Sequence, residues 1–195
     1  MRNPLSDKIV SIPPSGIRKF FDIVNEMEGA ISLGVGEPDF DTPWHIREEG
    51  IYSLEKGRTF YTSNAGLKQL RDEICNYLKR RFEVSYDPDT EVMVTVGGSE
   101  AIDVAMRAML NPGDEVITFA PYFGEYRSYV NNFDGVLVEI SPNTVDFQPK
   151  LDEFEAKITP KTKAVIVNTP NNPTGVIYSD ATLTRLADIL RAKSA

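Results

Sequence analysis

The sequence predicts an α/β fold in which helices alternate with the strands of a mostly parallel sheet. Short apolar runs typical of buried strands are each followed by an amphipathic stretch with helical spacing. The predicted strands are 92–96, 115–119, 136–140 and 164–167. This alternation favours right-handed crossovers between parallel strands. Ligands of such sheets lie at the carboxyl ends of the strands, so we expect a site in the loops after Val96, Phe119 and Val167.

Helical periodicity and capping residues predict the remaining elements. The predicted helices are 15–27, 43–56, 66–82, 101–110, 125–132, 151–158 and 180–190. We expect Thr42 to be an N-cap with Pro43 in the first helical position, and Gly57 to end that helix. Ser179 is expected to cap the last helix. A short apolar stretch at 31–33 precedes a turn-rich loop.

Composition excludes several classes of function. The formal net charge of −8 argues against nucleic-acid binding, which needs concentrated Lys and Arg. A single cysteine, Cys75, permits no intrachain disulfide, and a single histidine, His45, argues against a His/Cys metal site. The first ten residues carry charges and have no apolar core typical of a signal peptide. We therefore expect a cytoplasmic protein whose partners are small molecules or other protein chains.

The glycine-rich turn after the first predicted strand is a candidate phosphate site. Gly97 and Gly98 allow close approach of an anion, and the helix that follows directs free N–H groups and its positive dipole end at one point. The Ser99 hydroxyl would add a donor. An ordinary strand-to-helix turn has the same residues, so the motif alone leaves both readings open. A hydrolase nucleophile elbow is disfavoured, because its base would be a histidine downstream of Ser99 and His45 lies upstream.

The loop after the last predicted strand reads Thr-Pro-Asn-Asn-Pro-Thr-Gly at 169–175. Asn-Pro and Thr-Gly are common turn formers. Two adjacent amides in a proline-rich loop at the end of a strand would also suit a rigid polar ligand. In this setting, Asn-Asn-Pro-Thr-Gly resembles the signature of the class I/II aminotransferases, which are fold-type I enzymes dependent on pyridoxal 5′-phosphate (PLP).

Other segments resemble this family in the same order. They are the substrate loop at 33–40, the dimer-interface segment at 61–71, the phosphate loop at 94–101, the turn at 112–116 and the ring-stacking segment at 121–123. The resemblance implies a three-layer αβα sandwich, here the incomplete large domain at 41–195, preceded by an N-terminal helical segment at 1–40 that includes part of the small domain and the substrate loop. It also implies a homodimer that uses an amino acid and a 2-oxo acid.

The resemblance assigns the coenzyme contacts residue by residue. Gly98, Ser99 and the Glu100 backbone would bind the PLP phosphate. Phe123 would stack on the pyridine ring, although phenylalanine is equally common in protein cores. Asn172 would donate a hydrogen bond to the ring hydroxylate oxygen.

Further contacts concern the substrate and the neighbouring subunit. Tyr61 would reach the phosphate bound by the partner subunit. Gly36 would present its backbone to the substrate carboxylate, and Asn172 would also border the substrate.

PLP transamination also needs a lysine, a carboxylate for the pyridine nitrogen and an arginine for the substrate carboxylate. In the family these follow the Asn-Pro-Thr-Gly loop, and no lysine of this chain lies in a stretch like the family's lysine motif. We therefore expect this polypeptide by itself, as the N-terminal portion only, to bind PLP weakly, to lack transaminase activity and to associate through uncovered sheet edges and apolar faces. Alternatives are a PLP-dependent carbon–sulfur lyase, or a non-catalytic fragment or pseudoenzyme of the same fold.

Overall fold

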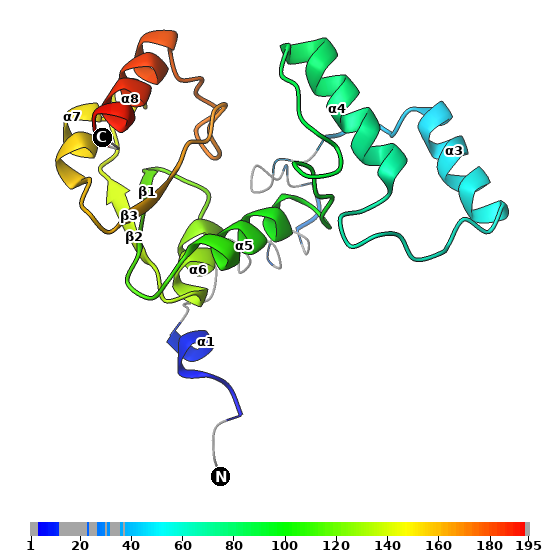
Figure 1. The fold of residues 1–195 in the computed structure, drawn as a ribbon, viewed down its shortest axis with the longest axis horizontal. Helices are drawn as coiled ribbons and strands as arrows, with labels where there is room; N and C mark the ends of the chain where they lie inside the picture. Colours follow the sequence, from blue (N-terminus) through cyan, green and yellow to red (C-terminus); the bar gives the residue numbers. More distant parts are fainter. Residues whose placement is uncertain are drawn as a thin grey trace. The chain divides into compact units, whose positions relative to one another are not determined.

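The computed structural model describes residues 4–11, 23, 27–29, 31, 36 and 38–193. The helices are α1 (Asp7–Ser11), α3 (Trp44–Glu55), α4 (Lys68–Phe82), α5 (Gly98–Met109), α6 (Glu125–Asn132), α7 (Leu151–Lys157) and α8 (Asp180–Lys193), and the strands are β1 (Glu115–Phe119), β2 (Val136–Ile140) and β3 (Thr162–Ile166) (Figure 1). The chain divides into two compact units. We call Val96–Ala195 with Met1–Ile9 the sheet unit, and Val10–Thr95 the helical unit.

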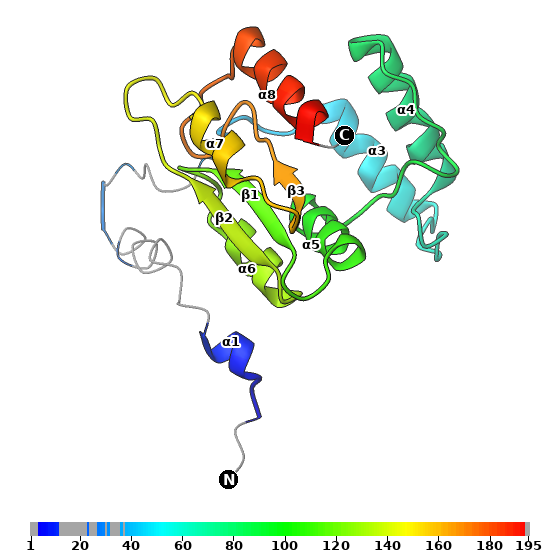
Figure 2. The same cartoon turned by 60° about the vertical axis from the view of Figure 1, so that its left-hand side comes forward.

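The sheet unit contains three parallel strands in the order β2-β1-β3 (Figure 2). The central strand β1 places Ile117 opposite Val138 of β2 on one side and opposite Val165 of β3 on the other. β1 and β2 have the bounds that the sequence predicts, and β3 begins and ends slightly before the predicted 164–167. The predicted parallel sheet is therefore confirmed.

Helices cover both faces of this sheet. Val116 of β1 packs with Met106 of α5 and Val130 of α6. The next residue, Ile117, belongs to a second core on the opposite face. This second core consists of Ile117, Phe119, Ile140, Phe154, Leu186 and Ile189, contributed by β1, β2, α7 and α8. Because successive side chains of a strand point to opposite faces, β1 is buried on both sides, and the αβα layering is confirmed.

The segment at 92–96 is not a strand, so this prediction is wrong. Val96 is 92% exposed, and the amide of Val94 bonds to the carbonyl of Ala65 at 3.0 Å. A run rich in valine becomes a strand only where a neighbouring strand accepts and donates its backbone hydrogen bonds. Within the described part of the chain, no strand pairs with this segment.

The predicted end residues are confirmed for α8 and for the end of α3, and corrected for the start of α3. The Ser179 hydroxyl accepts a hydrogen bond from the amide of Thr182 at 3.1 Å, so Ser179 caps α8 as predicted. Gly57, with φ +65°, follows the end of α3 as predicted. The N-cap of α3 is Pro43 and not Thr42, because the Pro43 carbonyl already accepts the first helical hydrogen bonds while its backbone is extended.

Most other helices lie where periodicity predicts them. α4, α6 and α7 match the stretches predicted near 66–82, 125–132 and 151–158. The helix predicted at 15–27 and the apolar stretch at 31–33 fall largely outside the described residues. The domain boundary after residue 40 stays a prediction.

Among the described residues of the helical unit, few side chains are buried. In α4 the buried residues are Arg71 and Cys75, whereas α3 has none. The Arg71 guanidinium donates a hydrogen bond to the Pro88 carbonyl, which ties α4 to the loop that follows it. Gly66 lies against Val94: a Cβ atom at Gly66 would be 2.7 Å from the Val94 Cβ. This close approach requires glycine, as does its φ of +95°.

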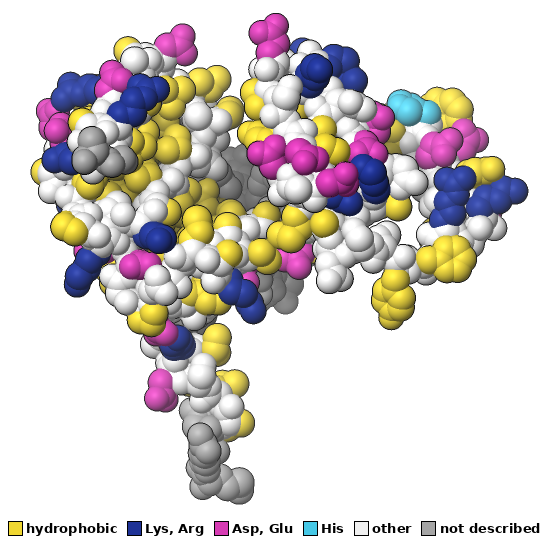
Figure 3. Space-filling model, in the orientation of Figure 1, with side chains coloured by type: hydrophobic (Ala, Val, Ile, Leu, Met, Phe, Trp, Pro, Cys, Tyr) yellow, Lys and Arg dark blue, Asp and Glu magenta, His cyan; other side chains and the backbone are white. Residues whose placement is uncertain are grey.

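The surface carries interspersed charges of both signs on the face shown in Figure 3. His45, the single histidine of the sequence, is exposed there, with its ring edge-on to Trp44 at 6.4 Å between centroids. In the described ranges, no three His, Cys, Asp or Glu side chains are grouped so that they could hold a metal ion. No described helix is both long enough and apolar enough to cross a membrane.

The Gly66→Ala substitution is predicted to lower the free energy of unfolding by about 1–3 kcal/mol, because it adds a clash with Val94 and places alanine at positive φ. Gly50→Ala is the matched control. Gly50 lies within α3 with open space around its Cβ position, so alanine should raise stability by about 0.5–1 kcal/mol. Urea denaturation of both variants measures these free energies of unfolding. Equal changes in the two variants would contradict the role given to Gly66.

Glu153 should make stability depend on pH in the acid range. Its carboxylate bonds to Lys157, at 2.7 Å, and to the backbone and hydroxyl of Ser141, and these contacts lower its pKa from 4.5 to about 2. A lowered folded-state pKa stabilises the protein above pH 4.5, and the contribution disappears as the pH falls toward 2. Glu153→Gln should therefore melt below the parent chain at pH 7, and the difference should shrink toward pH 2. A difference that is constant over this range would contradict the assignment.

Candidate functional site

The loops that follow β1 and β3 meet at one edge of the sheet, because these strands are parallel neighbours. Asn171 links the two loops. Its Nδ2 donates hydrogen bonds to the Pro121 carbonyl and to the Tyr178 hydroxyl, each at 3.3 Å. Its Oδ1 accepts from the amide of Thr174 at 3.3 Å. Asn171 is only 7% exposed, so these bonds also satisfy a polar group that would be costly to bury alone.

Asn168 makes a second link, from the loop after β3 to the start of α6. Its Nδ2 donates to the Tyr126 hydroxyl at 3.2 Å, and its Oδ1 accepts from the backbone amide of Asn172 at 2.9 Å. Tyr126, on the first turn of α6, is 4% exposed. Burial raises the pKa of its hydroxyl, so the hydroxyl is neutral at physiological pH. Asn172 itself is exposed.

Three aromatic rings pack together where the loop after β1 meets α6. The Phe123 ring meets the Tyr126 ring edge-on, with 5.7 Å between centroids and 76° between planes. Tyr122 stacks on Tyr126, at 6.1 Å and 12°. Such pairs contribute about 0.5–1.5 kcal/mol beyond the area they bury. Tyr126 therefore contacts Phe123 through its ring and the Asn168–Asn172 segment through its hydroxyl.

The Tyr122 ring of this cluster is also bound through its hydroxyl group. The Tyr122 hydroxyl donates to Glu139 Oε1 at 2.5 Å, and Arg127 forms an ion pair with the same carboxylate. Burial, and then the hydrogen bond to Glu139, raise the pKa of Tyr122. The orientation of Tyr122 is thus set from β2, at the same edge of the sheet.

The amino end of α5 is the candidate phosphate seat. α5 begins at Gly98, three residues before the predicted start, and its N-cap Gly97 has φ +89°. No side chain caps the first turn, so the Gly98, Ser99 and Glu100 amides lack intrahelical partners. The space around the Cβ positions of Gly97 and Gly98 is open. The Glu100 carboxylate accepts a hydrogen bond from the Val96 amide at 2.5 Å, and the Glu100 backbone N–H lies in the first turn of α5, where it has no intrahelical acceptor.

The predicted site residues divide between the two units. Gly98, Ser99, Glu100, Phe123 and Asn172 all lie in the sheet unit. Hydrogen bonds join the Phe123 and Asn172 loops. The third predicted loop is the one at Gly97–Ser99, and the sheet does not position it, because the strand expected before it is absent from the described structure. Its place beside the other two stays a prediction.

The two other predicted contacts lie in the helical unit. Tyr61 is 106% exposed, and Gly36 is exposed with open space around it. Full exposure is compatible with the expected contact between Tyr61 and a partner subunit. The roles of Tyr61 and Gly36 stay predictions.

Sequence reasoning missed two residues that join the loops. Neither Asn168 nor Tyr126 belongs to a motif of the sequence, and Asn171 is predictable only as one of the two amides in its motif. The available signal was position: Asn168 is the second residue after β3, and Tyr126 lies on the first turn of the helix after β1. Polar residues at the carboxyl ends of adjacent parallel strands are well placed to meet.

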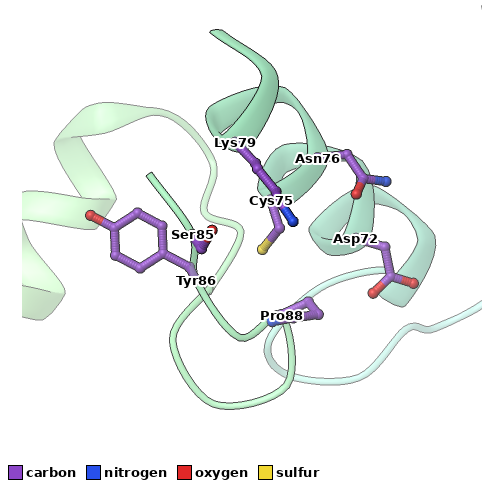
Figure 4. A pocket seen from close by; sticks show the side chains of 7 residues that line it. All are labelled: Asp72, Cys75, Asn76, Lys79, Ser85, Tyr86 and Pro88. Atoms are coloured by element: carbon purple, nitrogen blue, oxygen red, sulfur yellow. The ribbon is translucent and has the colours of Figure 1, made fainter. Parts of the chain in front are cut away.

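A cavity in the helical unit lies apart from these loops in the sequence (Figure 4). It is open, has a volume of about 360 Å³, and is lined by Asp72, Cys75, Asn76, Lys79, Ser85, Tyr86 and Pro88. Figure 4 shows the Cys75 thiol directed toward the loop that carries Pro88. None of the predicted coenzyme residues lines this cavity.

Comparison with known proteins agrees with the motifs. The model of the family "Aminotransferase class I and II" matches residues 28–195. The chain is 51% identical over 193 residues to the Bacillus subtilis protein YugH, covering 98% of this chain and 50% of that one. It is 41% identical over 185 residues to aromatic-amino-acid aminotransferase 2 of Thermococcus litoralis, covering 94% and 48%.

Solved structures give the same result. The aspartate aminotransferase from Thermus thermophilus with maleate superposes with a TM-score of 0.90 and 36% identity, covering 98% of this chain and 51% of that one. The chain spans about half the length of the relatives it matches. With a family match over 168 of 195 residues (28 through 195), the chain belongs to the class I and II aminotransferases.

Proposed function

We propose that this chain forms the coenzyme-cradling half of a PLP-dependent aminotransferase, which moves an amino group between an amino acid and a 2-oxo acid. The observation that carries the proposal is the joining of two motif loops at one sheet edge by Asn171 and Asn168. The relatives are named aminotransferases, which favours transamination over carbon–sulfur lyase chemistry.

The residues of the sheet unit fit the coenzyme chemically. The free amides at the start of α5 and the Ser99 hydroxyl suit a dianionic phosphate, which the helix dipole also stabilises. Phe123 offers a ring face or edge for an aromatic heterocycle, and the exposed Asn172 amide can donate to an anionic ring oxygen. When bound, PLP supplies an electron sink for carbanionic charge at the amino acid α-carbon.

Each of these side chains would act by binding and orientation. Asn172, by donating to the ring oxygen, would favour its ionised form. Phe123 would limit rotation of the ring plane and exclude water from one face. Gly36 would hold the substrate carboxylate with its backbone, and Tyr61 would contribute to the phosphate site of a partner subunit in a homodimer. None of these residues is assigned the covalent bond to the coenzyme or the transfer of protons, and we propose that other residues of the whole protein supply both.

Ser99→Ala in the whole protein should raise the dissociation constant for PLP about tenfold, since one hydrogen bond to a charged group contributes roughly 1.5 kcal/mol. Ser128→Ala, a serine-to-alanine change within α6, is the control and should leave the dissociation constant unchanged. Equilibrium titration followed by coenzyme absorbance measures both. A Ser99→Ala protein that binds as tightly as the parent would remove Ser99 from the phosphate site.

The 195-residue polypeptide by itself should not bond covalently to PLP at a defined lysine. Equimolar PLP, reduction with borohydride and peptide mass spectrometry should reveal no stoichiometric adduct, whereas the whole protein should carry one. Its transaminase activity should be undetectable for the same reason. A stoichiometric adduct traced to one lysine of this polypeptide would contradict the prediction.

A further inference from the structure

Tyr126 occupies a position from which it contacts both loops of the candidate site. Its ring meets Phe123 edge-on at 5.7 Å, and its hydroxyl accepts a hydrogen bond from Asn168 at 3.2 Å. Asn168 in turn accepts the backbone N–H of Asn172 at 2.9 Å. No motif assigned to the site contains Tyr126 or Asn168.

This geometry couples the two groups expected on the coenzyme ring. The Asn168 side chain is hydrogen-bonded to Tyr126 at one end and to Asn172 at the other. The position of the Asn172 backbone therefore depends on the position of α6, which carries Tyr126. Asn172 is exposed, and the bond from its backbone N–H to Asn168 limits where its side-chain amide can point. Tyr126, by contrast, is 4% exposed and fixed on both sides by rings.

We propose that Tyr126 is a positioning residue of the coenzyme site, which through Asn168 fixes the Asn172 amide relative to the Phe123 ring. This inference rests on the proposed function. Tyr126 touches neither substrate nor coenzyme in this scheme. Its effect should appear in the property that Asn172 controls, the ionisation of the coenzyme ring hydroxyl.

The test is a pH titration of the coenzyme absorbance in the whole protein. Loss of the Asn172 hydrogen bond disfavours the ionised ring oxygen, so Asn172→Ala should raise the midpoint of this ionisation. Tyr126→Phe keeps both ring contacts and removes only the hydroxyl, and it should raise the midpoint by about 0.5–1 pH unit. In the Asn172→Ala background, Tyr126→Phe should cause no further change, because it acts through Asn172.

Tyr129→Phe is the matched control. Tyr129 lies one turn further along α6, and its hydroxyl makes no hydrogen bond to a described residue. The control should keep the parent midpoint. Should Tyr126→Phe fail to fold, Asn168→Ala removes the same link. It should raise the midpoint of the ionisation, by no more than Asn172→Ala raises it.

The outcomes separate this inference from the function on which it rests. An unchanged midpoint in Tyr126→Phe, or an equal shift in both backgrounds, overturns the role of Tyr126 while the aminotransferase proposal stands. A parent protein that takes up no coenzyme absorbance overturns the proposed function, and the role of Tyr126 with it.

Discussion

The parallel pairing of β1 with β3 is the constraint on which the candidate site depends. It places the ends of two strands that are more than forty residues apart in the sequence at the same sheet edge. The αβα layers make this pairing stable, since β1 is buried by α5 and α6 on one face and by α7 and α8 on the other. If β1 lost its cover on either face, the two loops would lose their common support.

Two adjacent asparagines in the loop after β3 differ in burial and in the use of their side-chain amides. Asn171 is buried and uses its amide to join the loops, whereas Asn172 is exposed and keeps its side chain available. A similar division holds after β1, where buried Tyr126 of α6 supports the more accessible Phe123 of the loop. Binding groups held by a buried second layer of hydrogen bonds keep their geometry without giving up access to a ligand.

Local pattern was sufficient for much of the fold and for the choice of loops. The strands at 115–119 and 136–140 were predicted with their observed bounds because they are apolar runs between clear turn signals, and Ser179 was predicted because capping is a local interaction. The segment at 92–96 has the same local character but does not pair. Whether an apolar run becomes a strand depends on a neighbour that its own residues do not specify.

The supporting residues were harder to predict for the same reason. Asn168 and Tyr126 are 42 residues apart, and neither belongs to a motif, so only tertiary structure reveals their contact. The residues expected to touch the coenzyme were found through motif resemblance, which carries no information on what holds them in place. Asn171 was visible in its motif, but its burial and its bond to Pro121 were not.

The central claim is that the amino end of α5 and the Asn172 amide bind one and the same PLP molecule. A crystal structure of the whole protein with bound PLP tests it most directly. The account predicts phosphate oxygens within hydrogen-bonding distance of the Gly98, Ser99 and Glu100 amides, and the ring oxygen within the same reach of Asn172 Nδ2. A coenzyme bound elsewhere, or one that contacts the α5 amides while Asn172 lies too far away to reach it, would contradict the account.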